Sequence, residues 1–230
     1  GGWVLPPAHL DGAALLTLFA DWTRWCRQAG YRAIDYKPVP YIYHSCPSQE
    51  DLYALWRLGF TPASVLLSST IDLSSPWKFD MSKRQQLRKA RACDISIAES
   101  RDWDTFWHIL GKCLADRHGA VPVHSLDEIK ALAASFPANI RLFLLSDAQG
   151  PQAGVCIYDT GVVAHSQYAA TTPEARKRHY LTEIFPSRRY FDFGTSNEQA
   201  GRVLNAGLLG QKHSMGATGV AYTRYTLNLN

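Results

Sequence analysis

The sequence predicts an α+β fold built around a mostly antiparallel sheet. Amphipathic helical segments alternate with β-rich segments along the 230 residues, and three consecutive β-rich segments between 140 and 171 are joined by short turns. Hydrophobic residues make up 46% of the chain, which is enough for a sizeable core. The length suggests one or two compact domains, and no short internal repeat is present.

Charge and cysteine usage narrow the class of protein. A net charge of +4 is mildly basic and falls short of the clustering expected of a committed nucleic-acid binder. No apolar run approaches the length of a membrane span and no secretory leader is recognisable, so we expect a cytoplasmic protein. Five widely spaced cysteines without a CxxC pair argue against a disulfide framework and against a structural zinc site; they are Cys26, Cys46, Cys93, Cys113 and Cys156.

The first part of the chain predicts helix, strand, helix, strand. Apolar residues at helical spacing follow Asp11, the expected N-cap, and Gly30 is the expected C-terminal stop. Ser48 is expected to cap a second helix, which Gly59 ends. The predicted strands are 31–37 and 64–73.

A basic helix and a second lobe follow. Residues 81–94 carry five Lys and Arg side chains, which form either a solvated face or a contact with phosphate or nucleic acid. A strand at 95–100 precedes a helix that starts near Trp103, and Ser125 with Glu128 forms a capping box for the next helix. Residues 140–171 then predict the antiparallel meander.

The end of the chain places a polar run where an apolar strand stops. Residues 190–193 predict a strand, residues 194–198 are small or polar, and 219–229 predict the final strand. We expect a helix to begin at Glu198. At 100° per residue that helix would pack one face and present a polar stripe on the other. The stripe would hold Arg202, Asn205, Leu209 and Lys212, and the packed face Val203, Leu204, Gly207 and Leu208.

Nine stretches, distributed over nearly the whole chain, carry a family resemblance. They are KPVPYIYH (37–44), DLYALWRLG (51–59), SSTIDL (68–73), RKA (88–90), RHGAVPVHSLDEI (117–129), FPANIRLF (136–143), AGVCIYD (153–159), AHSQYAA (164–170) and DFGTSNEQAGRVLNAGLLGQKHSMGA (192–217). These stretches resemble the GNAT-type acyltransferases, in the branch related to the Fem peptidoglycan-bridge ligases.

The resemblance implies a GNAT-like fold with a mixed, mostly antiparallel central sheet flanked by helices. Members of this branch usually have two GNAT-like halves. Residues 1–80 would be the remnant of the first half, and residues 81–230 the complete second half. GNAT folds place a long helix after the strand at 164–170, yet only YLTEIFPSRR (180–189) is available, with Pro186 inside it. Either this helix is rudimentary or residues are missing between Pro173 and Tyr190, and we expect the latter.

The resemblance also implies acyl-CoA, such as acetyl-CoA, as donor. The eight histidines are isolated in the sequence, so we expect no metal. GNAT folds bind the diphosphate where a Gly-rich loop opens a helix. The matching stretch, 172–179, lacks the glycines but carries Arg176, Lys177 and Arg178, which either bind phosphate by charge or form a solvated loop. Gln167 and Ala169 belong to the strand that splays from its neighbour in a GNAT-like sheet, which leaves backbone groups for the acyl-pantetheine arm.

Alternation along that strand predicts two sets of side chains. His165, Gln167 and Ala169 would face one side, and Ser166, Tyr168 and Ala170 the other. Buried polar groups need partners, so several on one strand favour a site. We expect Tyr168 to be the catalytic acid and His165 to be catalytic, although a hydrogen-bonded core histidine remains an alternative.

The polar run is expected to bind the acceptor. Glu198 is the expected general base if the acceptor is an amine. His124 is either an alternative base or merely the residue before a helix N-cap. The predicted substrate-binding residues are His124, Asp192, Thr195, Ser196, Asn197, Asn205 and Lys212.

Together these features predict an acyltransferase that moves an acyl group from acyl-CoA to an amine or hydroxyl of a sugar or cell-envelope precursor. An aminoacyl-tRNA-dependent transferase, with the basic helix on the tRNA, is one alternative. A GNAT-like domain that binds a glycan or protein without catalysis is another, and the missing glycines at 174–179 favour it.

Overall fold

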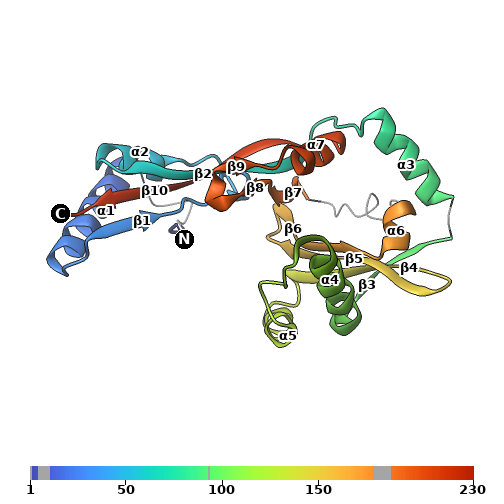
Figure 1. Ribbon diagram of the computed structural model, residues 1–230. Coiled ribbons are helices and arrows are strands. Elements are labelled where there is room, and N and C mark those ends of the chain that lie inside the picture. The colour runs from blue at the N-terminus through green and yellow to red at the C-terminus, as the bar shows by residue number, and fades with distance from the viewer. Residues whose placement is uncertain (1, 5–10, 93, 179–187) are drawn as a thin grey trace. The chain divides into compact units, whose positions relative to one another are not determined.

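The computed structural model describes residues 2–4, 11–92, 94–178 and 188–230 (Figure 1). The chain forms two compact units. The first comprises residues 1–68, 195–206 and 219–230, and the second comprises residues 69–194 and 207–218. Strand β2 (Thr61–Asp72) therefore contributes residues to both units. The α+β class with helices around a mostly antiparallel sheet is confirmed.

The first unit packs two helices against a small sheet. Its strands are hydrogen-bonded in the order β1-β10-β2, with β1 antiparallel to β10. Aromatic rings fill its core, and Phe19 contacts Trp3, Trp22 and Tyr36. Its elements are α1 (Gly12–Gln28), β1 (Ala33–Tyr36), a 3-10 turn (Tyr41–Tyr43), α2 (Glu50–Arg57), the start of β2, the hairpin β8 (Asn197–Glu198) and β9 (Val203–Leu204), and nearly all of β10 (Thr218–Asn228).

The second unit holds the larger part of the sheet. Its strands follow the order β2-β7-β6-β5-β4-β3; the pairs from β3 to β6 are antiparallel, and β7 is parallel to β6. The predicted meander is confirmed. The elements are α3 (Met81–Arg91), β3 (Ser96–Ser100), α4 (Trp103–His118), α5 (Leu126–Ser135), β4 (Ile140–Asp147), β5 (Gly150–Asp159), β6 (Val163–Thr171), α6 (Pro173–Arg178), β7 (Tyr190–Thr195) and α7 (Ala206–Ser214).

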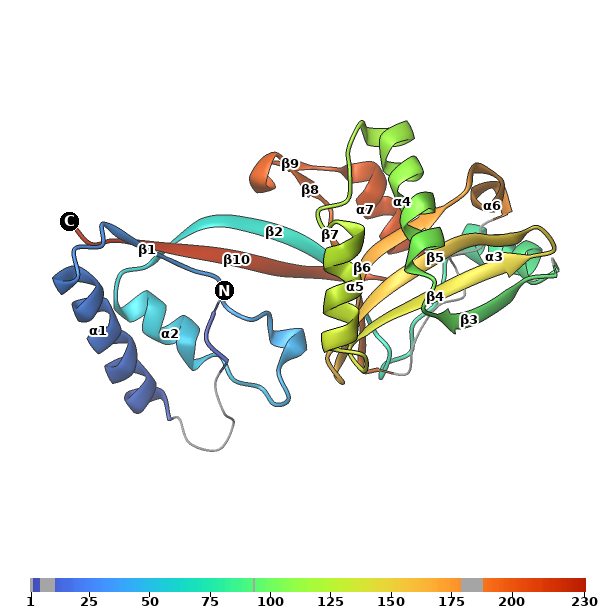
Figure 2. The same ribbon diagram turned by 90° about the horizontal axis from the view of Figure 1, so that it is seen from below.

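Helices cover both faces of this sheet. On one face α4 and α5 pack Phe106, Trp107 and Ile129 against Leu142 and Cys156 (Figure 2). On the other face, side chains of α3 and α6 join a second core cluster that includes Leu145, Val155 and Ile157. Alternating residues of β5 thus serve opposite layers, as the two-residue period of a strand requires.

The helix ends largely follow the sequence signals. Asp11 caps α1 by accepting a hydrogen bond from the amide of Ala14. Ser125 and Glu128 form both hydrogen bonds of the predicted capping box. The prediction that Ser48 caps α2 is wrong, because its hydroxyl donates to the Glu50 carboxylate at 2.6 Å and Gln49 takes the cap position.

The predicted helix from Glu198 to Lys212 is also wrong. Glu198 is extended and belongs to β8, and the chain reverses through Gln199 and Ala200, both at positive φ, before β9. Helix α7 begins only at Ala206. The residues expected on its packed face lie elsewhere or are exposed, with Val203 and Leu204 in β9 and Leu208 at 38% exposure.

The helix does not form because residues 196–205 make hydrogen bonds to distant residues, which local sequence patterns cannot predict. The amide of Leu67 in β2 donates to Asn197 Oδ1 at 2.6 Å, and the carbonyl of Leu67 accepts from the amide of Ser196. The Asn205 amide donates to the Ser196 carbonyl. These bonds hold 196–205 as a hairpin, so the stripe of Arg202, Asn205 and Lys212 does not exist. The segment between Pro173 and Tyr190, where we expect residues to be missing or the helix to be rudimentary, falls mostly outside the described residues.

Close packing in the second unit gives a first prediction. A Cβ on Gly154 would lie 2.6 Å from Phe106 Cδ2 and 2.9 Å from Leu144 Cδ2, whereas a Cβ on Gly111 of α4 would meet nothing within 4 Å. We expect Gly154→Ala to lower the free energy of unfolding by about 1–3 kcal/mol through overpacking.

The control, Gly111→Ala, should raise it by about 0.5–1 kcal/mol because alanine favours a helix interior. Urea unfolding of the three proteins measures both effects. Equal stability of Gly154→Ala and the parent protein would contradict the packing described for this face.

Candidate functional site

Strands β6 and β7 separate within the second unit. Their pairing extends over only three positions and ends with His165 opposite Asp192. Beyond that point β6 continues to Thr171 with β5 as its paired neighbour. Among the described residues, the other edge of β6 from Ser166 onward has no strand partner. This edge leaves backbone groups that an extended ligand can bind.

A β-bulge changes which side chains share a face. Cys156 pairs with Tyr168 and Ile157 with Ser166, so Gln167 is the extra residue of β6. Residues directly opposite one another on paired strands face the same side. His165, opposite Tyr158, and Tyr168, opposite Cys156, therefore lie on one face. The prediction that His165 and Tyr168 face opposite sides is wrong because strict alternation ignores the bulge.

A buried carboxylate organises the fork between β6 and β7. Asp192 is fully buried and its Oδ2 lies 2.8 Å from Nδ1 of His165, whose side chain is 22% exposed. Its Oδ1 accepts from the Thr70 hydroxyl at 3.1 Å and from the Gly194 amide at 3.1 Å. A carboxylate accepts only, so the proton of this pair resides on Nδ1 of His165 and Nε2 is the basic nitrogen.

Gly194 and Lys212 complete this cluster. Gly194 has φ +76°, and a Cβ there would lie 3.4 Å from Cε1 of His165, so glycine suits both the turn and the imidazole contact. The Lys212 ammonium donates to the Gly194 carbonyl at 2.9 Å. Burial lowers the pKa of Lys212 to about 8, an effect that the nearby charge of Asp192 opposes. Lys212 is thus buried, and the expected exposed position is wrong.

A second polar pair lies on the same face. The hydroxyl of Tyr168 lies 2.6 Å from Nδ1 of His124 and also accepts, at 3.4 Å, from the His124 amide. Trp107 of α4 stacks edge-on against Tyr168 at 5.2 Å and donates to the His124 carbonyl. The predicted residues His124 and Tyr168 are therefore brought together, and His124 is more than a residue preceding a cap.

Sequence reasoning missed three residues of this face. Thr70 and Trp107 hold the two pairs in place. The Tyr158 hydroxyl is buried without a hydrogen-bond partner among the described residues, and burial raises its pKa to about 12. The alternation of β5 could have indicated Tyr158, which lies two positions from the core residue Cys156. Thr70 gave no signal, because its contact with Asp192 spans the chain.

The predicted diphosphate segment forms the short helix α6. Arg176 is exposed and its guanidinium contacts the Cys113 sulfur at 3.5 Å. The side chains of Lys177 and Arg178 lie outside the described residues. Gln167 is the bulge residue, and Ala169 is exposed on β6 opposite Val155. Their roles as phosphate or acyl-donor contacts stay predictions.

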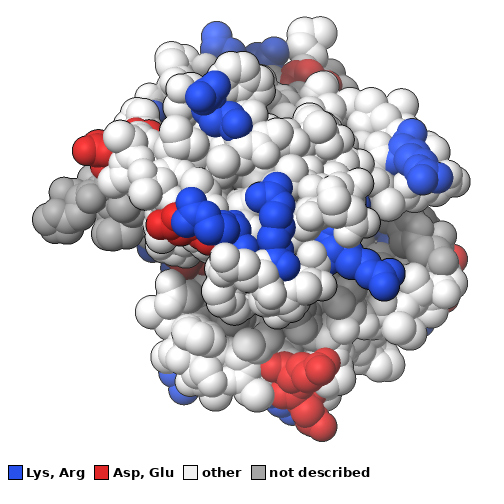
Figure 3. Space-filling view, turned by 90° about the vertical axis from the view of Figure 1, so that its left-hand side faces the viewer, with Lys and Arg blue, Asp and Glu red and all other residues white. Residues whose placement is uncertain are grey.

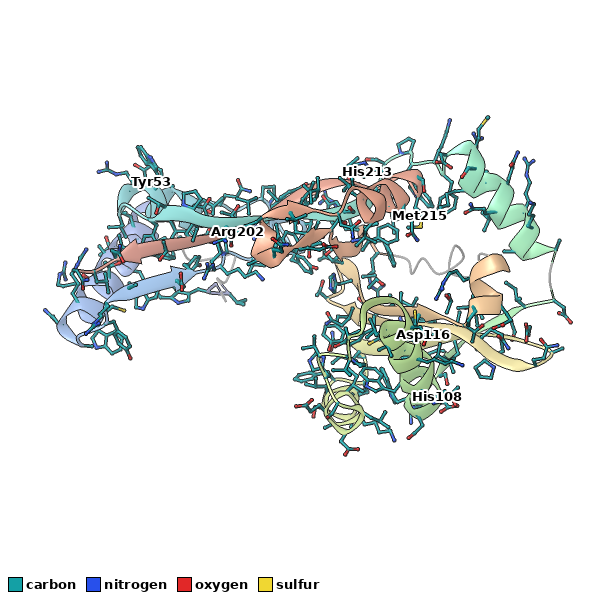
Figure 4. All side chains as sticks on the ribbon, in the orientation of Figure 1. Tyr53, His108, Asp116, Arg202, His213 and Met215 are labelled. Atoms are coloured by element: carbon teal, nitrogen blue, oxygen red, sulfur yellow. The ribbon has the colours of Figure 1, made fainter. Side chains whose placement is uncertain are left out.

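The remaining predicted residues belong to the polar run at 194–198 or to the hairpin that follows it. They do not cap a helix: Thr195 ends β7, Ser196 is buried, and Asn197 bonds to β2. The carboxylate of Glu198 accepts from the Asn205 side chain at 2.7 Å within the first unit. Arg202 is exposed beside β9 (Figure 4). Glu198 as the base, and the run as an acceptor site, stay predictions.

The part of the chain that the structure describes contains no group of three or more His, Cys, Asp or Glu residues placed to hold a metal ion. None of the described helices combines the length and apolar character required to cross a membrane.

Solved structures share this architecture. FemX superposes with a TM-score of 0.73 at 13% identity, over 96% of this chain and 78% of FemX. The C-terminal domain of a putative lysylphosphatidylglycerol synthetase from Agrobacterium fabrum gives a TM-score of 0.59 at 12% identity, over 95% of this chain and 75% of that one. The chain has a FemX-like GNAT fold.

L-PGS from Bacillus licheniformis shares the FemX-like GNAT fold with a TM-score of 0.54 at 12% identity, over 91% of this chain and 72% of that one. No family model matches the sequence, and no curated protein does so either. At these sequence identities the similarity establishes the fold alone, and the reaction has to be inferred from the residues of the site.

The buried lysine of this FemX-like GNAT fold gives a second prediction. Between a folded pKa of about 8 and the ordinary value near 10.5, the unfolded chain binds more protons, so stability rises with pH in that window. Lys212→Met removes the titrating group and with it this rise in stability. Between pH 7.5 and 9.5, we expect the free energy of unfolding to increase by about 1–2 kcal/mol more in the parent protein than in Lys212→Met.

Urea unfolding at the two pH values measures the difference. The exposed residue Lys112 supplies the control, since Lys112→Met should keep the parent's pH dependence. The burial of Lys212 is contradicted if Lys212→Met also keeps it.

Proposed function

We propose that this chain is an acyltransferase, in the first place an N-acyltransferase, whose catalytic centre is the His165–Asp192 pair at the fork between β6 and β7. The observation that carries the proposal is the 2.8 Å contact between Asp192 and Nδ1 of a partly exposed histidine, at the point where strand pairing ends. The carboxylate orients the imidazole and leaves Nε2 as the base. The FemX-like GNAT fold supports transfer of an acyl or aminoacyl group.

The reaction needs a base, an acid and a place for the donor. The acceptor nitrogen attacks the acyl carbonyl carbon and its proton passes to Nε2 of His165. The carbon–sulfur bond of the thioester breaks, and the leaving thiolate takes a proton from the Tyr168 hydroxyl, which shares a hydrogen bond with His124. The unpaired edge of β6 beyond His165 supplies backbone groups for the donor arm.

Acyl-CoA is the proposed donor, and an amine or hydroxyl of a sugar or cell-envelope precursor is the proposed acceptor. The residues predicted to contact the acceptor at 194–198 and at Asn205 lie mostly in the first unit, and their role stays a prediction. Glu198 stays an alternative base, and His165 is preferred because its orientation by a buried carboxylate matches the requirement for a positioned base.

Aminoacyl-tRNA is a second candidate donor. The C-terminal domain of a putative lysylphosphatidylglycerol synthetase shares this fold, and the name of that protein describes an aminoacylated lipid as the product. Helix α3 carries exposed Arg84, Arg88 and Lys89. Figure 3 draws one face of the molecule, on which Lys and Arg side chains stand among many uncharged residues. The net charge of the chain is only +4, and this modest charge favours the smaller donor.

Replacement of the proposed base tests the assignment. We expect His165→Gln to lower kcat for acetyl transfer from acetyl-CoA to an amino sugar by about 100-fold or more, because the acceptor proton loses its base. Asp192→Asn should cause a comparable loss by releasing the imidazole. Steady-state rates with a panel of amino sugars provide the measurement.

The control is His108→Gln, since His108 is an exposed residue of α4 (Figure 4). Turnover at the parent rate in His165→Gln would remove this histidine from the chemistry.

A binding experiment separates the two donors. Calorimetry should show saturable binding of acetyl-CoA with a modest dependence on added salt, because few phosphates are contacted. Steeply salt-dependent binding of aminoacyl-tRNA, with no heat from acetyl-CoA, would favour the second candidate. Absence of binding by both would favour a non-catalytic GNAT-like domain.

A further inference from the structure

The first unit contains a small cavity of its own. It has a volume of about 70 Å³ and lies between the segment 38–52 and strand β10. Its lining residues all belong to the first unit, so it is separate from the His165–Asp192 pair. The residues that matter for its chemistry are Pro38, Pro40, Tyr41, His44, Asp51 and Tyr225.

Asp51 gives this cavity a buried carboxylate. Its exposure is only 9%. One oxygen accepts from the Leu52 amide at 2.9 Å and the other from the Tyr36 hydroxyl at a long 3.4 Å. No Lys or Arg among the described residues forms an ion pair with it, and burial raises its pKa. A carboxylate with two neutral donors, one of them distant, has remaining capacity to accept hydrogen bonds.

His44 adds a second acceptor. Its Nε2 lies 2.9 Å from the Val39 carbonyl oxygen, which can only accept, so the ring proton is on Nε2. Nδ1 of the neutral ring is then an acceptor. That atom is buried and has no hydrogen-bond partner among the described residues. Buried acceptors without donors are rare in folded proteins, and the residue that carries this one, His44, lines the cavity.

The rest of the wall suits an organic cation. Tyr41 and Tyr225 supply aromatic surface, and Pro38 and Pro40 supply apolar surface. Rings attract ammonium groups through the negative charge of their faces. A metal ion fits less well, because no cluster of three His, Cys, Asp or Glu ligands occurs among the described residues. The cavity therefore presents acceptors and rings and requires a donor.

We propose that this cavity is a binding site for a small primary ammonium group, which donates N–H bonds to the Asp51 carboxylate and to Nδ1 of His44. The amine would be the end of a small metabolite or of a lysine-like side chain, and the cavity volume limits the buried part to a few heavy atoms. Charge-assisted hydrogen bonds from the ammonium would satisfy both acceptors.

Amide NMR spectra of the whole chain, titrated with methylammonium chloride, test the proposal. We expect saturable shifts for residues 39–52 and 221–225. Methanol has nearly the same size without the charge, and we expect it to bind at least tenfold more weakly; sodium chloride controls for ionic strength. Absence of saturable shifts with methylammonium, or equal binding of methanol, would overturn the proposal.

Substitutions locate the site. Asp51→Asn should weaken methylammonium binding about tenfold or more, through loss of the charged acceptor. Asp21→Asn, at an exposed ion pair of α1, should leave binding unchanged. Tyr41 is 51% exposed at the cavity, so Tyr41→Ala should fold and bind several-fold more weakly. If Asp51→Asn does not fold, Tyr41→Ala and the methanol comparison decide; parent-like affinity in Tyr41→Ala would then overturn the proposal.

Discussion

The buried carboxylate of Asp192 is the constraint on which the second unit depends. An ionised carboxylate inside a protein must find donors or a counter-charge, because its transfer from water is costly. Here the donors come from three strands: Thr70 of β2, Gly194 of β7 and His165 of β6. The hydrogen bonds that meet this requirement join β2, β7 and β6, and Nε2 of His165 has no hydrogen-bond partner among the described residues. The hydrogen bond between Asp192 and His165 therefore stabilises the fold and also orients the proposed base.

The geometry at the fork between β6 and β7 depends on two backbone irregularities, a β-bulge and a glycine at positive φ, as well as on charge. The bulge at Gln167 turns Tyr168 to the face that His165 already occupies, and this brings two pairs of polar side chains to one side of the sheet. Gly194 permits a positive φ beside the imidazole, and the Lys212 ammonium fixes its carbonyl. Bulges and glycines of this kind are frequent next to active sites, where they re-aim side chains.

Short sequence motifs correctly predicted those helix caps and turns that are determined by interactions between residues close together in the sequence. The cap at Asp11, the capping box at Ser125 and the meander at 140–171 are encoded within a few residues, and each is confirmed. The helix at 198–212 was wrong because bonds between Leu67 and the run at 196–197 span 130 positions and override helical periodicity. His165, Asp192, His124 and Tyr168 were named from residue type; their pairing was not, since one-dimensional alternation cannot reveal a bulge.

Nitrogen-15 NMR of the His165 ring shows which imidazole nitrogen carries the proton that Asp192 is inferred to hold. We expect a proton on Nδ1 in the neutral imidazole, and its loss or a marked shift of its signal in Asp192→Asn. An unprotonated Nδ1 in the neutral ring would overturn the assignment, because the carboxylate would then face a lone pair and could not orient the imidazole as a base.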